Sequence, residues 1–185
     1  KQVRNEFVKI RSELAFNQQG QWFNYGPINV GPRNNGIKKD GGRVKDIAFH
    51  PTNEDIYYVS TFKGGLFRTT NAGTSWVPLT DHLPHEVFIS KIVPSKPNTI
   101  FIGTDSGVLK SADAGVTWND TGLSTGKINA LLIKPDNENI ILAGSPSGIH
   151  RSIDGGVTFT QVQIASKTEE LRVHPTNADI MYAGT

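Results

Sequence analysis

The sequence has no cysteine and a single methionine among its 185 residues. The lack of cysteine excludes disulfide bonds, thiolate nucleophiles and cysteine-ligated metal sites. It does not identify a cellular compartment, because secreted bacterial proteins also lack cysteine in many cases.

A strong charge imbalance and a long apolar run are lacking as well. The formal net charge is +2, with charged residues at 19% and no charged tail, which gives no argument for a nucleic-acid partner. No apolar run is long enough to span a membrane, and no signal peptide is recognisable. We therefore expect neither a membrane span nor nucleic-acid binding.

Turn-forming residues are plentiful: the chain contains 19 glycines and 10 prolines. This content is typical of an all-β chain with many turns. The exception is the segment 1–15, where Val3, Phe7, Ile10 and Leu14 form one apolar stripe at helical spacing. We predict a short N-terminal α-helix that packs its stripe on the rest of the protein; a partner-binding helix is the alternative.

An octapeptide occurs three times at a regular interval. The copies read TTNAGTSW at 69–76, SADAGVTW at 111–118 and SIDGGVTF at 152–159, and their third residues are 42 and 41 residues apart. Residues 174–185 resemble the sequence that precedes each copy and so begin a fourth repeat. A repeat of 40–45 residues is the signature of β-propeller blades with four strands each.

The repeats divide the chain into blades at 42–84, 85–125 and 126–167, with an incomplete blade at 168–185; a connector fills 16–41. The predicted strands are 43–49, 56–61, 65–69 and 75–80; 87–93, 99–104, 107–111 and 117–121; 127–133, 140–145, 148–152 and 158–164; and 170–174 and 180–184. The second strand of each blade is almost continuously apolar, as in strands buried on both faces. His50 and His174 lie in equivalent connectors of separate blades, so we predict no metal site and no cofactor.

The octapeptide has the composition of a turn. Its third residue carries a short acceptor that bonds backbone N–H groups one or two residues on, its fifth is a glycine suited to positive φ, and its eighth is an aromatic that pins the loop. We therefore predict a structural role for Thr69, Asn71, Gly73 and Trp76, for Ser111, Asp113, Gly115 and Trp118, and for Ser152, Asp154, Gly156 and Phe159.

The octapeptide resembles the Asp-box, or BNR repeat, of sialidases, xyloglucanase-like glycoside hydrolases, sortilin (Vps10-type) domains and a photosystem II assembly factor. In these families the box lies between the third and fourth strands, on the face away from the active site. Residues 22–185 also resemble the propellers of large secreted Bacteroidetes-type proteins that use the type IX route. The resemblance implies a secreted or cell-surface protein, and residues 22–30 are then a candidate for the ring-closing outer strand.

Three blades and part of a fourth cannot close a ring. We therefore expect the natural protein to have about three or more further blades, which are the first predicted partners of this segment.

The face opposite the boxes is the one expected to carry function, because it holds the loops between the second and third strands. The candidate binding residues there are Phe62, Lys63, Asp105, Ser106, Pro146 and Ser147. The resembled xyloglucanases carry an acid in a T-D-x-G-G loop of their first blade, where this chain has Phe62; Asp105 matches that pattern in the second blade. Asp105 is thus the one candidate catalytic residue, and a turn-forming role is its alternative.

The sequence favours a binding scaffold for a protein or a polysaccharide. A glycoside hydrolase is the first alternative, since such enzymes need two carboxylates and the second could lie outside this chain. A Vps10-like peptide receptor is a weaker alternative. Whether the protein is an enzyme stays open, with the balance towards a non-enzyme.

Overall fold

A computed structural model describes residues 43–163 and 167–185. The predicted helix at 1–15 and the connector at 16–41, including the strand at 22–30, lie outside the described residues. Within the described part every element is a β-strand, so the prediction of an all-β fold is confirmed there.

The strands form three four-stranded antiparallel sheets and one hairpin. Blade 1 comprises β1 (Val44–Phe49), β2 (Tyr57–Thr61), β3 (Gly65–Thr69) and β4 (Val77–Pro78). Blade 2 comprises β5 (Val87–Val93), β6 (Lys96–Thr104), β7 (Val108–Ser111) and β8 (Asn119–Asp120). Blade 3 comprises β9 (Ala130–Ile133), β10 (Ile141–Ser145), β11 (Gly148–Ser152) and β12 (Thr160–Gln163), and β13 (Glu170–His174) pairs with β14 (Asn177–Gly184).

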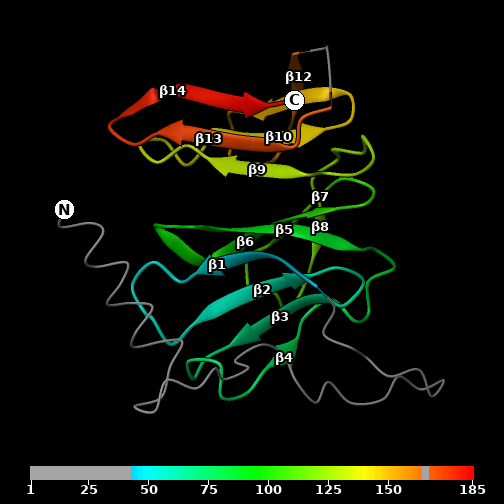
Figure 1. Ribbon diagram of the computed structural model, residues 1–185, viewed down its shortest axis with the longest axis vertical. Helices are drawn as coiled ribbons and strands as arrows, with labels where there is room; N and C mark the ends of the chain where they lie inside the picture. The colour runs from blue at the N-terminus through cyan, green and yellow to red at the C-terminus, as the bar shows by residue number, and fades with distance from the viewer. Residues whose placement is uncertain (1–42, 164–166) are drawn as a thin grey trace.

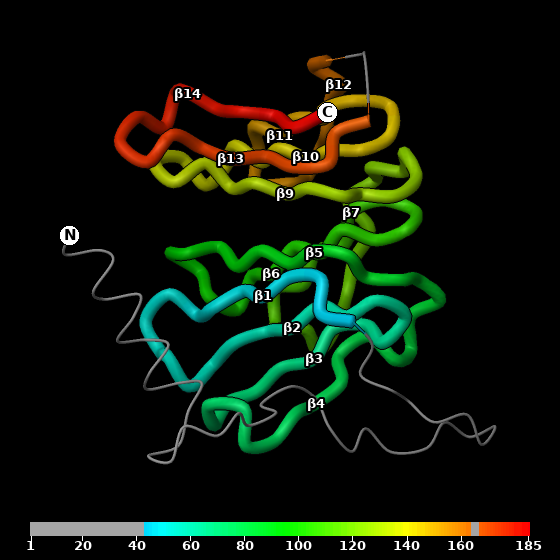
Figure 2. The backbone as a smooth tube through the Cα atoms, viewed as in Figure 1, coloured from blue at the N-terminus to red at the C-terminus, as the bar shows by residue number. Residues whose placement is uncertain are grey.

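The sheets are stacked in chain order, with blade 1 at one end and the β13–β14 hairpin at the other (Figures 1 and 2). The first strand of each blade contacts the first strand of the next: β1 contacts β5, β5 contacts β9 and β9 contacts β13. Each sheet follows the chain order of its four strands. This arrangement of meandering blades around a common line of first strands is that of a β-propeller.

The core lies between the blades, and the second strand of a blade contributes to two interfaces at once. In β6, Ile100 and Ile102 belong to the cluster between blades 1 and 2, while Phe101 belongs to the cluster between blades 2 and 3. In β10, Ile141 faces blade 2 and Leu142 faces the last hairpin. Successive strand residues point to opposite faces, so the predicted burial of these apolar strands on both sides is confirmed.

The octapeptide closes a turn through the same hydrogen bonds in each blade. In blade 2 the Ser111 hydroxyl accepts from the Gly115 N–H at 2.8 Å and donates to Asp113 Oδ1 at 2.8 Å. Asp113 Oδ1 accepts from the Thr117 N–H at 2.8 Å, and Oδ2 accepts from the Thr117 hydroxyl at 2.6 Å. Blade 3 repeats this set with Asp154, and blade 1 keeps its backbone part with Asn71.

The third residue of the octapeptide accepts a hydrogen bond from a more distant backbone N–H group than predicted. Its oxygen bonds the N–H four residues on, not one or two. The reason is that the fourth residue as well as the fifth has positive φ: Ala114 at 60° and Gly115 at 89°. Two consecutive left-handed residues reverse the chain tightly enough to bring Thr117 back to the Asp113 carboxylate.

In blades 1 and 2, a basic side chain on the third strand reaches the octapeptide of the next blade. Arg68 Nη1 donates to Ala114 O at 3.1 Å, and Lys110 Nζ donates to Gly155 O at 2.8 Å. Ala114 and Gly155 are the fourth residues of their octapeptides. Arg151 occupies the equivalent place in blade 3, where it is exposed.

Several strand bounds differ from the predicted ones. The fourth strands are only two residues long in blades 1 and 2, at Val77–Pro78 and Asn119–Asp120, because the octapeptide occupies the residues up to the aromatic. The segments 94–98 and 175–179, which lie between predicted strands, are partly strand, since β6 starts at Lys96 and β14 at Asn177. In blade 2 the pairing of Val93 with Lys96 leaves just two residues for the turn.

Candidate binding face

The loops between second and third strands form what we call the loop face: 62–64 in blade 1, 105–107 in blade 2 and 146–147 in blade 3. Each follows a hydroxyl residue that ends the second strand. Thr104 Oγ1 accepts from the N–H groups of Ser106 and Gly107 at 3.2 and 3.1 Å and donates to Gly107 O at 2.9 Å. Ser145 repeats the pattern in blade 3. The scaffold therefore fixes the backbone of these loops, while their outer side chains vary.

In blade 1 the loop face carries an aromatic ring surrounded by cations. Phe62 is half-buried, and its N–H donates to Arg43 O at 2.8 Å, which holds the loop beside the start of β1. Arg43 Cζ, Lys45 Nζ and Lys63 Nζ lie 5.8, 5.6 and 5.5 Å from the ring centroid. All three cations are exposed. We call Phe62 and these three residues the cationic cluster.

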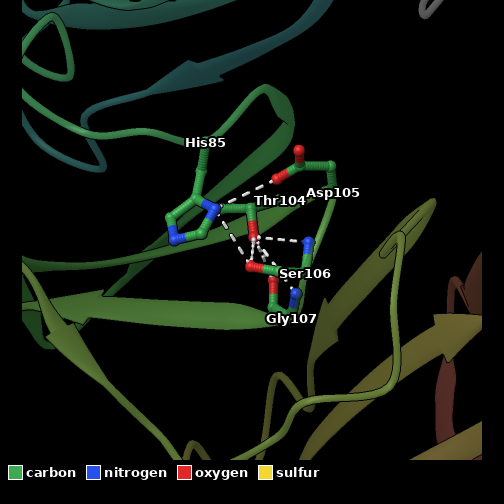
Figure 3. A network of polar contacts seen from close by, with 5 residues as sticks. All are labelled: His85, Thr104, Asp105, Ser106 and Gly107. Carbon is green, nitrogen blue, oxygen red and sulfur yellow. Dashed lines mark hydrogen bonds and ion pairs between the residues drawn. The ribbon is translucent and has the colours of Figure 1, made fainter.

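In blade 2 the loop is bound to an imidazole (Figure 3). His85, from the connection between blades 1 and 2, places Nδ1 3.2 Å from Asp105 Oδ1 and 3.1 Å from Ser106 Oγ. Asp105 is exposed and His85 is partly exposed. The candidate carboxylate is therefore engaged in an ion pair whenever the imidazole is protonated.

In blade 3 a different imidazole takes a similar place. His150 projects from β11 and is 5% exposed. Its Nε2 lies 3.3 Å from Ser145 Oγ and 3.4 Å from Ser147 Oγ. Burial lowers the pKa of His150, so its ring is neutral at neutral pH and exchanges hydrogen bonds with two hydroxyls. Pro146 is exposed beside it.

These groups do not have the geometry of an activated nucleophile. In a Ser-His-Asp triad the hydroxyl and the carboxylate bind opposite ring nitrogens. Here Ser106 and Asp105 both approach Nδ1 of His85. Among residues 43–163 and 167–185, no group of three or more His, Asp or Glu side chains is placed to hold a metal ion.

The sequence prediction named some residues of each pair or cluster and missed their partners. Phe62, Lys63, Asp105, Ser106 and Ser147 lie on the loop face as the strand order requires. Their missed partners are Arg43, Lys45, His85 and His150. Arg43 and Lys45 were recoverable, because the start of a first strand pairs with the end of the second; His85 and His150 differ in place from blade to blade and had no repeat signal.

The two histidines in the connectors have a local role. Nδ1 of His50 accepts from the N–H groups of Thr52 and Asn53 at 3.3 and 3.1 Å. Nδ1 of His174 accepts from the Thr176 N–H at 3.3 Å. Both imidazoles thus close the turn that follows them.

Fold and repeats together define a β-propeller protein whose variable residues lie on one loop face. A family model described as the DUF6242 beta propeller domain matches residues 34–181. The chain belongs to this family.

Similar proteins include carbohydrate-active enzymes. A xyloglucanase of Paenibacillus sp. is 31% identical over 99 residues, which cover 45% of this chain and 10% of that enzyme. The crystal structure of an ancestral GH74 enzyme matches with a TM-score of 0.70 at 23% identity, over 78% of this chain and 22% of that one. A structure described as YCF48 bound to D1 peptide matches with a TM-score of 0.54 at 18% identity, over 74% of this chain and 46% of that one.

The chain spans about a tenth of the length of the curated relative that it matches. The two solved structures, both under 25% identical, show the fold alone. Within the described residues, no helix is long and apolar enough to cross a membrane.

Proposed function

We propose that this chain is part of a secreted or cell-surface β-propeller that binds a polysaccharide or a protein on its loop face and does not cleave it. One observation carries the proposal. The blade 1 loop presents the Phe62 ring and three exposed cations, at the place where the resembled hydrolases have an acid. Loops that differ on a fixed scaffold are the usual location of binding sites.

The distribution of carboxylates supports binding over cleavage. A glycosidase needs two carboxyl groups about 5–10 Å apart across the scissile bond. Asp105 is the only carboxylate in the three described loops of the loop face. Its Oδ1 lies 3.2 Å from Nδ1 of the His85 imidazole, so this carboxylate already has a partner within the protein.

A glycoside hydrolase is the second candidate. It is favoured by the 31% identity to a protein named xyloglucanase and by the exposure of the Asp105 carboxylate. In this alternative Asp105 is one member of the pair, and the other member comes from outside residues 43–163 and 167–185. A peptide receptor is a weaker candidate, for which the structure of YCF48 bound to D1 peptide gives a precedent in the same fold.

The binding scaffold includes further blades of the same protein. Trp118 Nε1 donates to Leu79 O of the preceding blade at 3.2 Å. The equivalent Nε1–H of Trp76 is buried and has no acceptor among the described residues. Phe49, whose ring contacts the Tyr57 ring as that of Trp76 does, is 64% exposed. Both features fit a preceding blade that supplies a carbonyl and an apolar face.

The test is hydrolysis by the full-length protein on xyloglucan, β-glucans and sialosides, measured as released reducing ends or sialic acid. Asp105→Asn is compared with Asp55→Asn, which changes an exposed carboxylate on the opposite side of blade 1. We expect no turnover by any form, together with retention of the protein on one of the immobilised polysaccharides or on a protein partner. Hydrolysis that Asp105→Asn abolishes and Asp55→Asn keeps would make the protein an enzyme and overturn the proposal.

A further inference from the structure

Two cations of the cluster, Arg43 and Lys45, keep their charge available for a ligand. Among the described residues, no carboxylate pairs with Arg43 or Lys45. Two other lysines are paired with carboxylates: Lys91 with Asp46 at 3.2 Å, and Lys134 with Asp136 at 2.5 Å. Exposed cations that lack a carboxylate partner are the part of this surface best able to attract an anion.

The Phe62 ring explains how three like charges stay together. Each cation is attracted by the negative face of an aromatic ring, with about 0.5–1 kcal/mol at exposed sites. That attraction comes from the ring quadrupole, so it orders the cations without cancelling their charge. The N–H of Phe62 is bound to Arg43 O at 2.8 Å, which fixes the ring against the strand that carries Lys45.

A second cation–aromatic contact continues this pattern along the loop face. Lys127 Nζ lies 4.4 Å from the centroid of the Phe88 ring. Phe88 is 9% exposed and thus belongs to the core. The cation at the start of blade 3 is therefore also held by a ring and not by a carboxylate.

The loops of blades 2 and 3 also offer hydroxyl and imidazole groups, which in blade 2 lie beside the Asp105 carboxylate. Ser106 Oγ and Ser147 Oγ each lie beside an imidazole, at 3.1 and 3.4 Å from the nearest ring nitrogen of His85 and His150. Hydroxyl and imidazole groups both donate and accept, as sugar hydroxyls do. An acidic polysaccharide carries carboxylates and hydroxyls together, whereas an acidic peptide carries carboxylates without an array of hydroxyls.

We propose that the loop face binds a uronate-containing polysaccharide, with Arg43 and Lys45 of the cationic cluster on its carboxylates and the side-chain hydroxyls of Ser106 and Ser147 on its hydroxyls. This inference rests on the proposed binding function and names its ligand class.

The experiment measures binding of the full-length protein to polygalacturonate by isothermal titration and affinity electrophoresis. Xyloglucan is the neutral polysaccharide control, and poly-glutamate is the anionic peptide control. The test variant is Arg43→Gln/Lys45→Gln/Lys63→Gln. The matched control is Lys96→Gln, an exposed lysine at the start of β6 and outside the loop face.

We expect polygalacturonate to bind more tightly than xyloglucan. The triple variant should lose roughly tenfold in affinity, since it removes the exposed ion pairs with the ligand. Lys96→Gln should bind like the wild type. Raising the salt concentration should weaken the wild type and have little effect on the triple variant. Ser147→Ala should weaken polygalacturonate binding about twofold to fivefold and leave poly-glutamate unchanged.

Three results would overturn the inference. If the triple variant bound polygalacturonate as tightly as the wild type, the cationic cluster would not be part of the binding site. Tighter binding of poly-glutamate than of polygalacturonate would make the ligand an acidic peptide. Tighter binding of xyloglucan would reject the acidic ligand but keep the proposed binding function, which fails only if no polysaccharide and no protein is bound. If the triple variant fails to fold, Lys45→Gln and the salt titration of the wild type decide the same question.

Discussion

The two faces of the same blades differ in how closely they repeat. On the octapeptide face the Gly N–H donates to the hydroxyl of Thr69, Ser111 or Ser152 at 2.8–2.9 Å in every blade. On the loop face, an aromatic with cations, an imidazole with a carboxylate, and an imidazole with hydroxyls follow one another. The octapeptide face holds neighbouring blades together, so every copy must meet the same steric requirement. The side chains of the loop face are free to vary, as those of a binding surface must.

The largest effect should come from a methyl group added on the octapeptide face. In Gly156→Ala the new Cβ would lie 2.4 Å from the Phe101 ring and 3.4 Å from Ile141, at a φ of +80°. We expect a loss of roughly 3 kcal/mol in the free energy of unfolding, from overpacking and left-handed strain. Urea denaturation measures it.

The matched control is Gly122→Ala, where φ is +75° and no heavy atom lies within 4 Å of the new Cβ. There only the backbone strain remains, so we expect about 1 kcal/mol. Equal losses at the two glycines would show that contact between blades through the octapeptide contributes nothing.

Acid should selectively weaken the octapeptide face. Hydrogen bonds from the Thr117 hydroxyl and N–H, and then from Ser111, lower the pKa of Asp113 from 3.8 to about 2; bonds from Thr158 and Ser152 lower the pKa of Asp154 as well. A lowered folded-state pKa gives stability that is present above pH 4 and lost as the pH falls towards 2.

The variant Asp113→Asn/Asp154→Asn imitates blade 1, where Asn71 takes this position. It should show a flatter dependence of the free energy of unfolding on pH between 4 and 2, measured by urea titration at each pH. A slope as steep as that of the wild type would assign the acid sensitivity to other carboxylates.

The cation that crosses between blades should have a smaller effect. Arg68→Met removes the bond to Ala114 O and should lower the free energy of unfolding by about 1 kcal/mol. Arg151→Met is the matched substitution at an exposed site, and should change the stability of residues 1–185 by less than about 0.5 kcal/mol. In the full-length protein we expect Arg151→Met to lower the free energy of unfolding as much as Arg68→Met does. There a backbone carbonyl of a further octapeptide would accept a hydrogen bond from Arg151.

The loop face should be the most tolerant. Pro146→Ala alters an exposed residue in the blade 3 loop and should change the free energy of unfolding by less than about 0.5 kcal/mol. Thermal unfolding of this variant beside Gly156→Ala gives the sharpest contrast between the faces. A large loss with Pro146→Ala would mean that this loop supports the scaffold.

The same difference between the two faces explains how much of the fold and of the site could be predicted from the sequence. Repetition at 41–42 residues identified the blades, their strands and the octapeptide, because every copy reports the same steric requirement. It did not reveal the bond between Arg68 and the octapeptide of the next blade, since that contact joins residues 46 positions apart. The site was harder still: His85 and His150 come from non-equivalent elements, so no repeat indicated that they meet their serines.

The alternation of side chains along β6 and β10 has a consequence for the dynamics of the molecule. Strand β6 contributes Ile100 to one cluster and Phe101 to the next. Loss of the neighbouring blade on one side therefore weakens its packing against the blade on the other side. In a protein made of residues 1–185 alone, local unfolding should therefore start in the outer blades. Blade 2, which packs against a neighbour on both sides, should unfold last. Amide hydrogen exchange would display this as protection that is greatest in β6 and declines towards β1 and β14.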